Sequence, residues 1–160
     1  MLRRTSLSPE QALQKARHYC GYQERCHSQV EEKLYSFGLR KPQVEAVLAT
    51  LIEENYLNEE RFAIQYAGGH FRLKHWGKVR IRYQLKQKQV SDYCIKKALA
   101  SIDDEDYERT LAKLAEQKWE KINAEAEQDV HPLARKRQLQ EYLLGKGFEA
   151  DRIAHVLPAK

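Results

Sequence analysis

Apolar residues recur at spacings of three and four along almost the whole chain, which is the period of an amphipathic α-helix. The alternation typical of strands is nearly absent, and the 160 residues include only seven glycines and four prolines. The pattern therefore predicts an all-α protein. Helices are expected at residues 8–21, 25–37, 41–54, 58–73, 77–88, 91–101, 103–127, 132–146 and 149–157.

Three stretches of this pattern align residue for residue without a gap. They start at Val30, Ile81 and Leu139, and each is predicted to form a helix, a short turn and a second helix. At the turn, Gly38 of the first stretch corresponds to Gly147 of the third, and either could take the left-handed conformation that ends a helix. The stretches are VEEKLYSFGLRKPQVEAVL (30–48), IRYQLKQKQVSDYCIKKAL (81–99) and LQEYLLGKGFEADRIAHVL (139–157).

A helix-start signal precedes each stretch. Ser8, Asn58 and Asp103 each follow an apolar residue and stand before acidic residues, so their side chains can cap a helix whose first turn suits negative charge. Each stretch with its preceding helix makes a three-helix module. We therefore predict an elongated tandem array of three three-helix, helix-turn-helix-like repeats. Their expected bounds are 8–56, 57–101 and 102–157.

Positive charge is concentrated in the middle of the chain. The whole chain carries a formal charge of +5, but residues 61–102 contain ten basic residues and one acid, Asp92. Such segregation is typical of a surface that meets a polyanion or an acidic partner, although a solvated helix face is the alternative. The candidate binding residues, which we call the basic segment, are Arg72, Lys74, Lys78, Arg80, Arg82, Lys86 and Lys88.

Two neighbouring features have open interpretations. Tyr83 and Val79 lie opposite Ile81 on the predicted helix, so they are either exposed, where Tyr83 could stack on a base, or buried on a second side. A secondary basic patch opens the helix expected at 132–146, and a solvated first turn is its alternative. The patch consists of Arg135, Lys136 and Arg137.

The sequence offers no pattern for catalysis or for a bound metal. Cys20, Cys26 and Cys94 match no zinc spacing and are expected to be reduced thiols. Because no catalytic triad, acid pair or phosphate-binding loop is present either, we expect no enzymatic activity, no cofactor and no metal. No apolar run is long enough for a membrane span, and MLRRTSLSPE lacks the apolar core of a secretory signal. We expect a cytoplasmic protein without a membrane partner. We take it as a monomer.

Four strings, in order, resemble the RecX family across roughly residues 10–157. In the third string, the matches to a family segment are Gly77, Arg80, Ile81, Leu85 and Lys88. Gln84 and Gln89 depart from the family's usual Glu and Gly, and the loss of a glycine at 89 is expected to change the turn. The strings are ALQKARHYCGYQERCHSQVEEKLYSFGL, YLNEERFAIQYA, GKVRIRYQLKQKQV and YLLGKGFEADRIAHVL.

The resemblance implies a function in DNA repair, homologous recombination and the SOS response. RecX proteins are all-α modulators of the RecA recombinase that bind in the groove of its filament on single-stranded DNA. The expected partners are therefore the RecA filament and single-stranded DNA, the latter bound directly or through the filament. The resemblance thus implies a negative regulator that limits filament assembly, ATPase activity and strand exchange. The charge pattern makes the basic segment its candidate contact surface. Two other functions stay open: a basic helical module that binds DNA alone, and a helical-repeat scaffold for an acidic protein.

Overall fold

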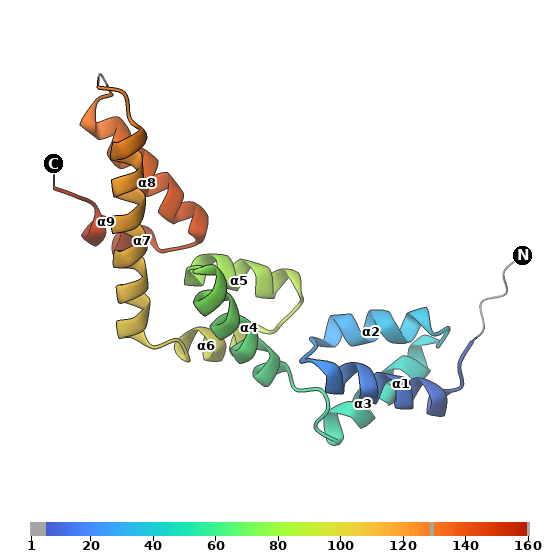
Figure 1. The fold of residues 1–160 in the computed structure, drawn as a ribbon. Coiled ribbons are helices and arrows are strands. Elements are labelled where there is room, and N and C mark those ends of the chain that lie inside the picture. Colours follow the sequence, from blue (N-terminus) through green and yellow to red (C-terminus); the bar gives the residue numbers. More distant parts are fainter. Residues whose placement is uncertain (1–5, 129, 160) are drawn as a thin grey trace, which may run out of the picture. The chain divides into compact units, whose positions relative to one another are not determined.

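The computed structural model describes residues 6–128 and 130–159, and these form nine α-helices and no strand (Figure 1). The all-helical prediction is confirmed, and no helix end lies more than two residues from its expected position. The helices are α1 (Pro9–Tyr22), α2 (His27–Ser36), α3 (Lys41–Glu53), α4 (Glu59–Lys74), α5 (Lys78–Gln87), α6 (Asp92–Ala100), α7 (Asp104–Glu125), α8 (Pro132–Lys146) and α9 (Ala150–Val156).

The three predicted helix starts are confirmed by their hydrogen bonds. Ser8 Oγ accepts from the backbone N–H of Gln11 at 3.2 Å, and the Gln11 side chain accepts from the Ser8 N–H at 3.1 Å, which makes a capping box. Asn58 and Asp103 accept from the backbone N–H three residues later, at 2.8 and 3.0 Å. Each cap satisfies a donor that the first turn of a helix leaves without a partner.

The turns of the three aligned stretches have one conformation. Gly38, Gln89 and Gly147 occupy equivalent positions, with φ of +89°, +64° and +98°. Each donates its backbone N–H over 3.0 Å to the carbonyl three residues earlier. The expectation that Gln89 changes the turn is therefore wrong. The turn persists because Val90, which follows Gln89, is buried and donates its N–H to the carbonyl of buried Leu85.

The first compact unit contains the described residues up to Tyr66 together with residues 85–98. Helices α1, α2 and α3 contact one another in pairs and enclose its core. Arg61 at the start of α4 forms an ion pair with Glu24 in the link between α1 and α2. The core side chains are Ala12, Ala16, Cys20, Val30, Leu34, Leu39, Val44, Val47, Leu51 and Leu57.

The second compact unit contains residues 67–84 and the described residues from 99 onward. Helix α7 packs against both α8 and α9, and these two also contact each other. Tyr107 of α7 is fully buried at the centre, with its ring centroid 5.7 Å from that of Phe71 and 5.2 Å from that of Phe148. Such tilted aromatic pairs add to the stabilisation that burial of their apolar area provides.

The division between the units falls inside α4 and α5. This division differs from the predicted repeat bounds of 8–56, 57–101 and 102–157. Those bounds and the elongated shape stay predictions. Residue 129, inside the predicted third repeat, lies outside the described residues.

Candidate binding surface of the basic segment

Helix α5 begins against the carboxyl end of α8 within the second unit. The backbone N–H groups of residues 77–79 have no acceptor inside their own helix, as at any helix start. They donate to Lys146 O at 2.8 Å, to Tyr107 Oη at 2.9 Å and to Gly147 O at 2.9 Å, in that order. A free helix start is a ready anion site. Because these donors are already satisfied, an anion at α5 has to be bound by side chains.

Two glycines allow this close approach. A Cβ added at Gly77 would lie 2.3 Å from the carbonyl carbon and oxygen of Gly147, and one added at Gly147 would lie 2.3 Å from Cβ of Arg80. Neither position therefore has room for a side chain. The sequence singled out both glycines, Gly77 by resemblance and Gly147 as a turn residue, but nothing in it indicated that they meet.

Tyr107 connects three elements, and sequence reasoning missed it. Its hydroxyl accepts from the backbone N–H of Lys78 and donates to the carboxylate of Glu149. Burial, and then the hydrogen bond to Glu149, raise the pKa of Tyr107 above its usual value. The hydroxyl therefore stays protonated and remains a donor. An aromatic residue inside the acidic run DDEDYER was the available signal.

Two cations of the basic segment are committed to the fold of the second unit. The Lys78 ammonium lies 4.8 Å from the centroid of the Tyr107 ring. The Arg80 guanidinium lies 4.4 Å from that of Trp76 and donates to the carbonyl of Gly145 at 3.3 Å. Both side chains are half-buried. Their charged groups lie against aromatic rings, which stabilises the packing, and remain partly accessible to water.

The other three cations of the segment in the second unit are exposed. Lys74 lies 5.3 Å from the Trp76 ring centroid, and its carbonyl accepts from the Lys146 ammonium at 2.8 Å. Burial, together with nearby Arg80, lowers the pKa of Lys146. The side chains of Arg72 and Arg82 form no hydrogen bond or ion pair with any residue that the structure describes. Their guanidinium groups are therefore free to bind an external anion.

The last two residues of the segment belong to the first unit. The Lys86 ammonium lies 3.8 Å from Asp92 Oδ1, and both side chains are exposed, so this ion pair contributes little. Lys88 is half-buried with its ammonium 5.7 Å from the Tyr66 ring centroid, and its carbonyl accepts from Ser28 Oγ at 3.0 Å. The cations of the segment that are most available are thus Arg72, Arg82 and Lys86.

Helix α5 exposes apolar side chains as well as cations. Val79 is 54% exposed and Tyr83, one turn later, is 60% exposed, so the alternative that they are buried on a second side is wrong. Arg82 is adjacent to Tyr83 in the chain and also exposed. Exposed apolar surface next to charge is typical of a surface that contacts a partner.

The secondary patch is only partly available. Arg135 donates to Asn123 Oδ1 at 3.2 Å and to the carbonyl of Glu127 at 3.3 Å, so it ties the start of α8 to the end of α7 and the segment after it. Lys136 is half-buried and Arg137 is exposed. Those two remain the patch's candidates for an external contact, and its role stays a prediction.

Other chemistry has little support within the described residues. They contain no group of three or more His, Cys, Asp or Glu placed to hold a metal ion. Cys20, Cys26 and Cys94 are free and buried. Of the helices described, none has the length and apolar character to cross a membrane. Part of the amino-terminal stretch used for the localisation prediction, residues 1–5, lies outside them.

Comparison with known proteins gives one consistent family. The family model for the RecX second three-helix domain matches residues 58–99. The regulatory protein RecX of Vibrio parahaemolyticus is 31% identical over 130 residues, which are 81% of this chain and 78% of that protein. That of Clostridium perfringens (strain 13) is 33% identical over 127 residues, 79% of this chain but 58% of the relative. The chain thus spans less than two thirds of the clostridial relative's length.

Solved structures share the fold. The crystal structure of RecX from Lactobacillus salivarius superposes with a TM-score of 0.82 at 22% identity, covering 92% of this chain and 93% of that one. A second crystal structure, of regulatory protein RecX, gives 0.81 at 23% identity, covering 92% of this chain and 70% of that one. At these identities the likeness concerns the fold alone, and the three-repeat helical arrangement agrees with it.

Proposed function

Because this chain belongs to the RecX family, we propose that it regulates the RecA recombinase by binding the RecA filament on single-stranded DNA. In this proposal it is a negative regulator without catalytic activity. It sits in the groove of the filament and limits filament assembly, ATP hydrolysis and strand exchange. The basic segment provides contacts from each unit, and its principal cations are Arg72 and Arg82 in the second unit and Lys86 in the first.

The observation that carries the proposal is the exposure of unpaired positive charge beside apolar side chains. The side chains of Arg72 and Arg82 have no hydrogen-bond or ion-pair partner among the described residues. Val79 and Tyr83 are exposed on the helix that carries Arg82. Cations bind phosphates or acidic loops whatever the base sequence of the DNA. A regulator of a filament that forms on any DNA requires such sequence-independent binding. The exposed apolar side chains can pack against apolar surface of a protein partner. A naked DNA duplex offers less apolar surface.

The covered start of α5 argues against a module that binds DNA alone with α5, its most basic helix, as the recognition helix. A helix-turn-helix protein inserts the first residues of its recognition helix into the major groove. Here Gly77 is buried, and the N–H groups of residues 77–79 are bonded to Tyr107 and to the end of α8. Helix α5 could present only a side of its surface, not its start, to a base pair.

Single-strand-dependent ATP hydrolysis by the cognate RecA tests the proposal. The native chain, added in substoichiometric amounts, should lower the rate. The triple variant Arg72→Ala, Arg82→Ala, Lys86→Ala should need about tenfold more protein for equal inhibition, because three exposed contacts contribute roughly 0.5 kcal/mol each. A matched control removes three exposed lysines elsewhere, with Lys41→Ala, Lys113→Ala and Lys121→Ala. It should inhibit like the native chain.

Two results would contradict the proposal. Unchanged hydrolysis, together with salt-sensitive binding to naked DNA, would favour the DNA-binding module. Equal loss of inhibition in the triple variant and its control would mean that net charge matters and the basic segment does not. We leave Lys78 and Arg80 intact because their contacts with Tyr107, Trp76 and Gly145 belong to the fold.

A further inference from the structure

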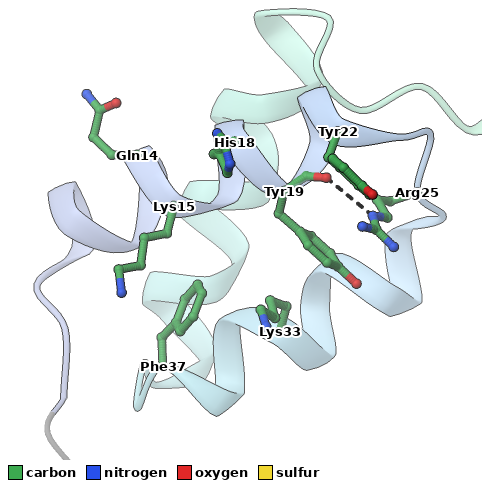
Figure 2. A pocket seen from close by; sticks show the side chains of 8 residues that line it. All are labelled: Gln14, Lys15, His18, Tyr19, Tyr22, Arg25, Lys33 and Phe37. Carbon is green, nitrogen blue, oxygen red and sulfur yellow. Dashed lines mark hydrogen bonds between the residues drawn. The ribbon is translucent and has the colours of Figure 1, made fainter.

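An open groove lies between α1 and α2 in the first unit, on residues that the proposed function does not use. Its volume is about 590 Å³. Figure 2 shows Lys15 and Phe37 at one end, Tyr22 and Arg25 at the other, and Tyr19 and Lys33 between them. Gln14 and His18 complete the lining, so three cations and three aromatic rings face one groove that no carboxylate lines.

The cations of the groove are held beside the rings. The Arg25 guanidinium lies 3.8 Å from the Tyr19 ring centroid and donates through Nε to the Tyr19 carbonyl at 3.3 Å. The Lys33 ammonium lies 5.4 Å from the Tyr19 centroid and 5.7 Å from that of Phe37, and Lys15 lies 5.9 Å from the latter. Their positive charge is thus arranged along the groove, and none of the three forms an ion pair with a carboxylate in the part of the chain that the structure describes.

Tyr22 is the most exposed of the three tyrosine and phenylalanine rings of the groove. It is 80% exposed, whereas Tyr19 and Phe37 are half-buried and have cations near their rings. An aromatic side chain left in water at the edge of a positive groove has the properties of a stacking platform. Aromatic platforms combined with a positive groove are how proteins bind single strands without sequence preference.

We propose that the groove between α1 and α2 is a binding site for single-stranded nucleic acid. A base stacks on Tyr22, and phosphates contact Lys15 and Lys33. An acidic peptide is the rival occupant and fits less well. Cation clusters also bind acidic motifs, but such a peptide makes no use of the exposed Tyr22 ring, on which a base can stack. The site uses no residue of the basic segment and does not depend on the proposed function.

The test uses the full ¹⁵N-labelled chain and hexathymidylate, without RecA. We expect amide shifts along α1 and α2 that saturate with oligonucleotide. Raising salt from 50 to 200 mM should weaken binding about twentyfold if three phosphates are neutralised. Tyr22→Leu, which keeps an apolar side chain but removes the stacking ring, should weaken binding about fivefold or more.

Charge removal separates the groove from its surroundings. Lys15→Ala with Lys33→Ala should weaken binding and lower the salt dependence. The control, Arg40→Ala with Lys41→Ala, removes two exposed charges at the start of α3 in the same unit and should bind like the native chain. Lys15, Tyr22 and Lys33 are themselves exposed, so their variants should fold normally, which circular dichroism checks.

Three outcomes would overturn the proposal. They are absence of binding, shifts confined to α4 and α5, and equal binding of hexaglutamate, which would assign the groove to acidic peptides. Because the probe is naked oligonucleotide, failure here leaves the RecA assay unaffected. Failure of that assay likewise leaves this site intact.

Discussion

The turn at Gln89 and the turn at Gly147 have the same backbone but very different surroundings. Both residues adopt positive φ and donate their N–H over 3.0 Å to the carbonyl three residues earlier. Gln89 is exposed, whereas Gly147 is buried against the start of α5. The fold requires the left-handed conformation at both sites. It requires glycine only where a second segment packs directly on the turn.

Two separable costs follow from this comparison. A side chain at positive φ strains the backbone by roughly 1–2 kcal/mol, and the chain tolerates this at Gln89. A side chain at Gly147 would also overlap Arg80, since the added Cβ would lie 2.6 Å from Arg80 N. The backbone of Arg80 cannot move aside as a flexible side-chain end could.

Gly147→Ala should have the largest effect. We expect a loss of at least about 3 kcal/mol in the free energy of unfolding, because strain at positive φ and overlap with Arg80 add together. Urea denaturation followed by circular dichroism measures it. The hydrogen bonds from residues 77–79 should weaken too, and amide exchange at the start of α5 reports that separately.

Gly38→Ala is the matched control at the third equivalent position. Gly38 has φ of +89°, close to that of Gly147, but its added Cβ would lie 2.9 Å from Ser6 Oγ, against 2.3 Å from Arg80 Cβ at Gly147. The overlap is therefore smaller and the strain should dominate, at about 1 kcal/mol. Equal losses at both glycines would show that the packing of α5 on the turn contributes nothing.

Tyr107→Phe tests the other contact that fixes α5 beside Gly147. The variant removes the donor to Glu149 and leaves the N–H of Lys78 without its acceptor. We expect a loss of about 2 kcal/mol, with the turn at Gln89 unaffected, because buried polar groups without partners are costly. Amide exchange of residues 78 and 90 would distinguish the two turns.

The raised pKa of Tyr107 gives this prediction a pH dependence. Tyrosine in the unfolded chain ionises near pH 10, whereas Tyr107 in the folded protein keeps its proton to higher pH. Its contribution to stability is therefore complete below about pH 10 and declines as pH rises further. The stability difference between the native chain and Tyr107→Phe should shrink above that pH. A constant difference would contradict the protonated donor.

Local patterns predicted the helices well, and the contacts between them poorly. The period of apolar residues and the capping side chains of Ser8, Asn58 and Asp103 depend on near neighbours, so the sequence contains them directly. The docking of residues 77–79 on the end of α8 joins segments some seventy residues apart, and no local pattern encodes it.

The candidate site was predictable in the same uneven way. The count of charged residues along the sequence identified the basic segment. It could not separate Lys78 and Arg80, whose contacts are with Tyr107, Trp76 and Gly145, from the freely exposed Arg72 and Arg82. That distinction depends on tertiary packing. The groove of α1 and α2 was missed because its cations and rings are spaced like an ordinary helix surface.

Gln89→Gly should have the smallest effect and the opposite sign. Glycine relieves strain of roughly 1–2 kcal/mol at positive φ but adds about 0.4–1 kcal/mol of conformational entropy to the unfolded chain. We expect a net gain of about 0.5–1 kcal/mol in the free energy of unfolding, measured by urea denaturation. Gln89→Ala, which shortens the side chain without relieving the backbone, should give no gain. If glycine at 89 instead destabilised the chain, the Gln89 side chain would have to stabilise this turn, and the two turns would differ in more than their surroundings.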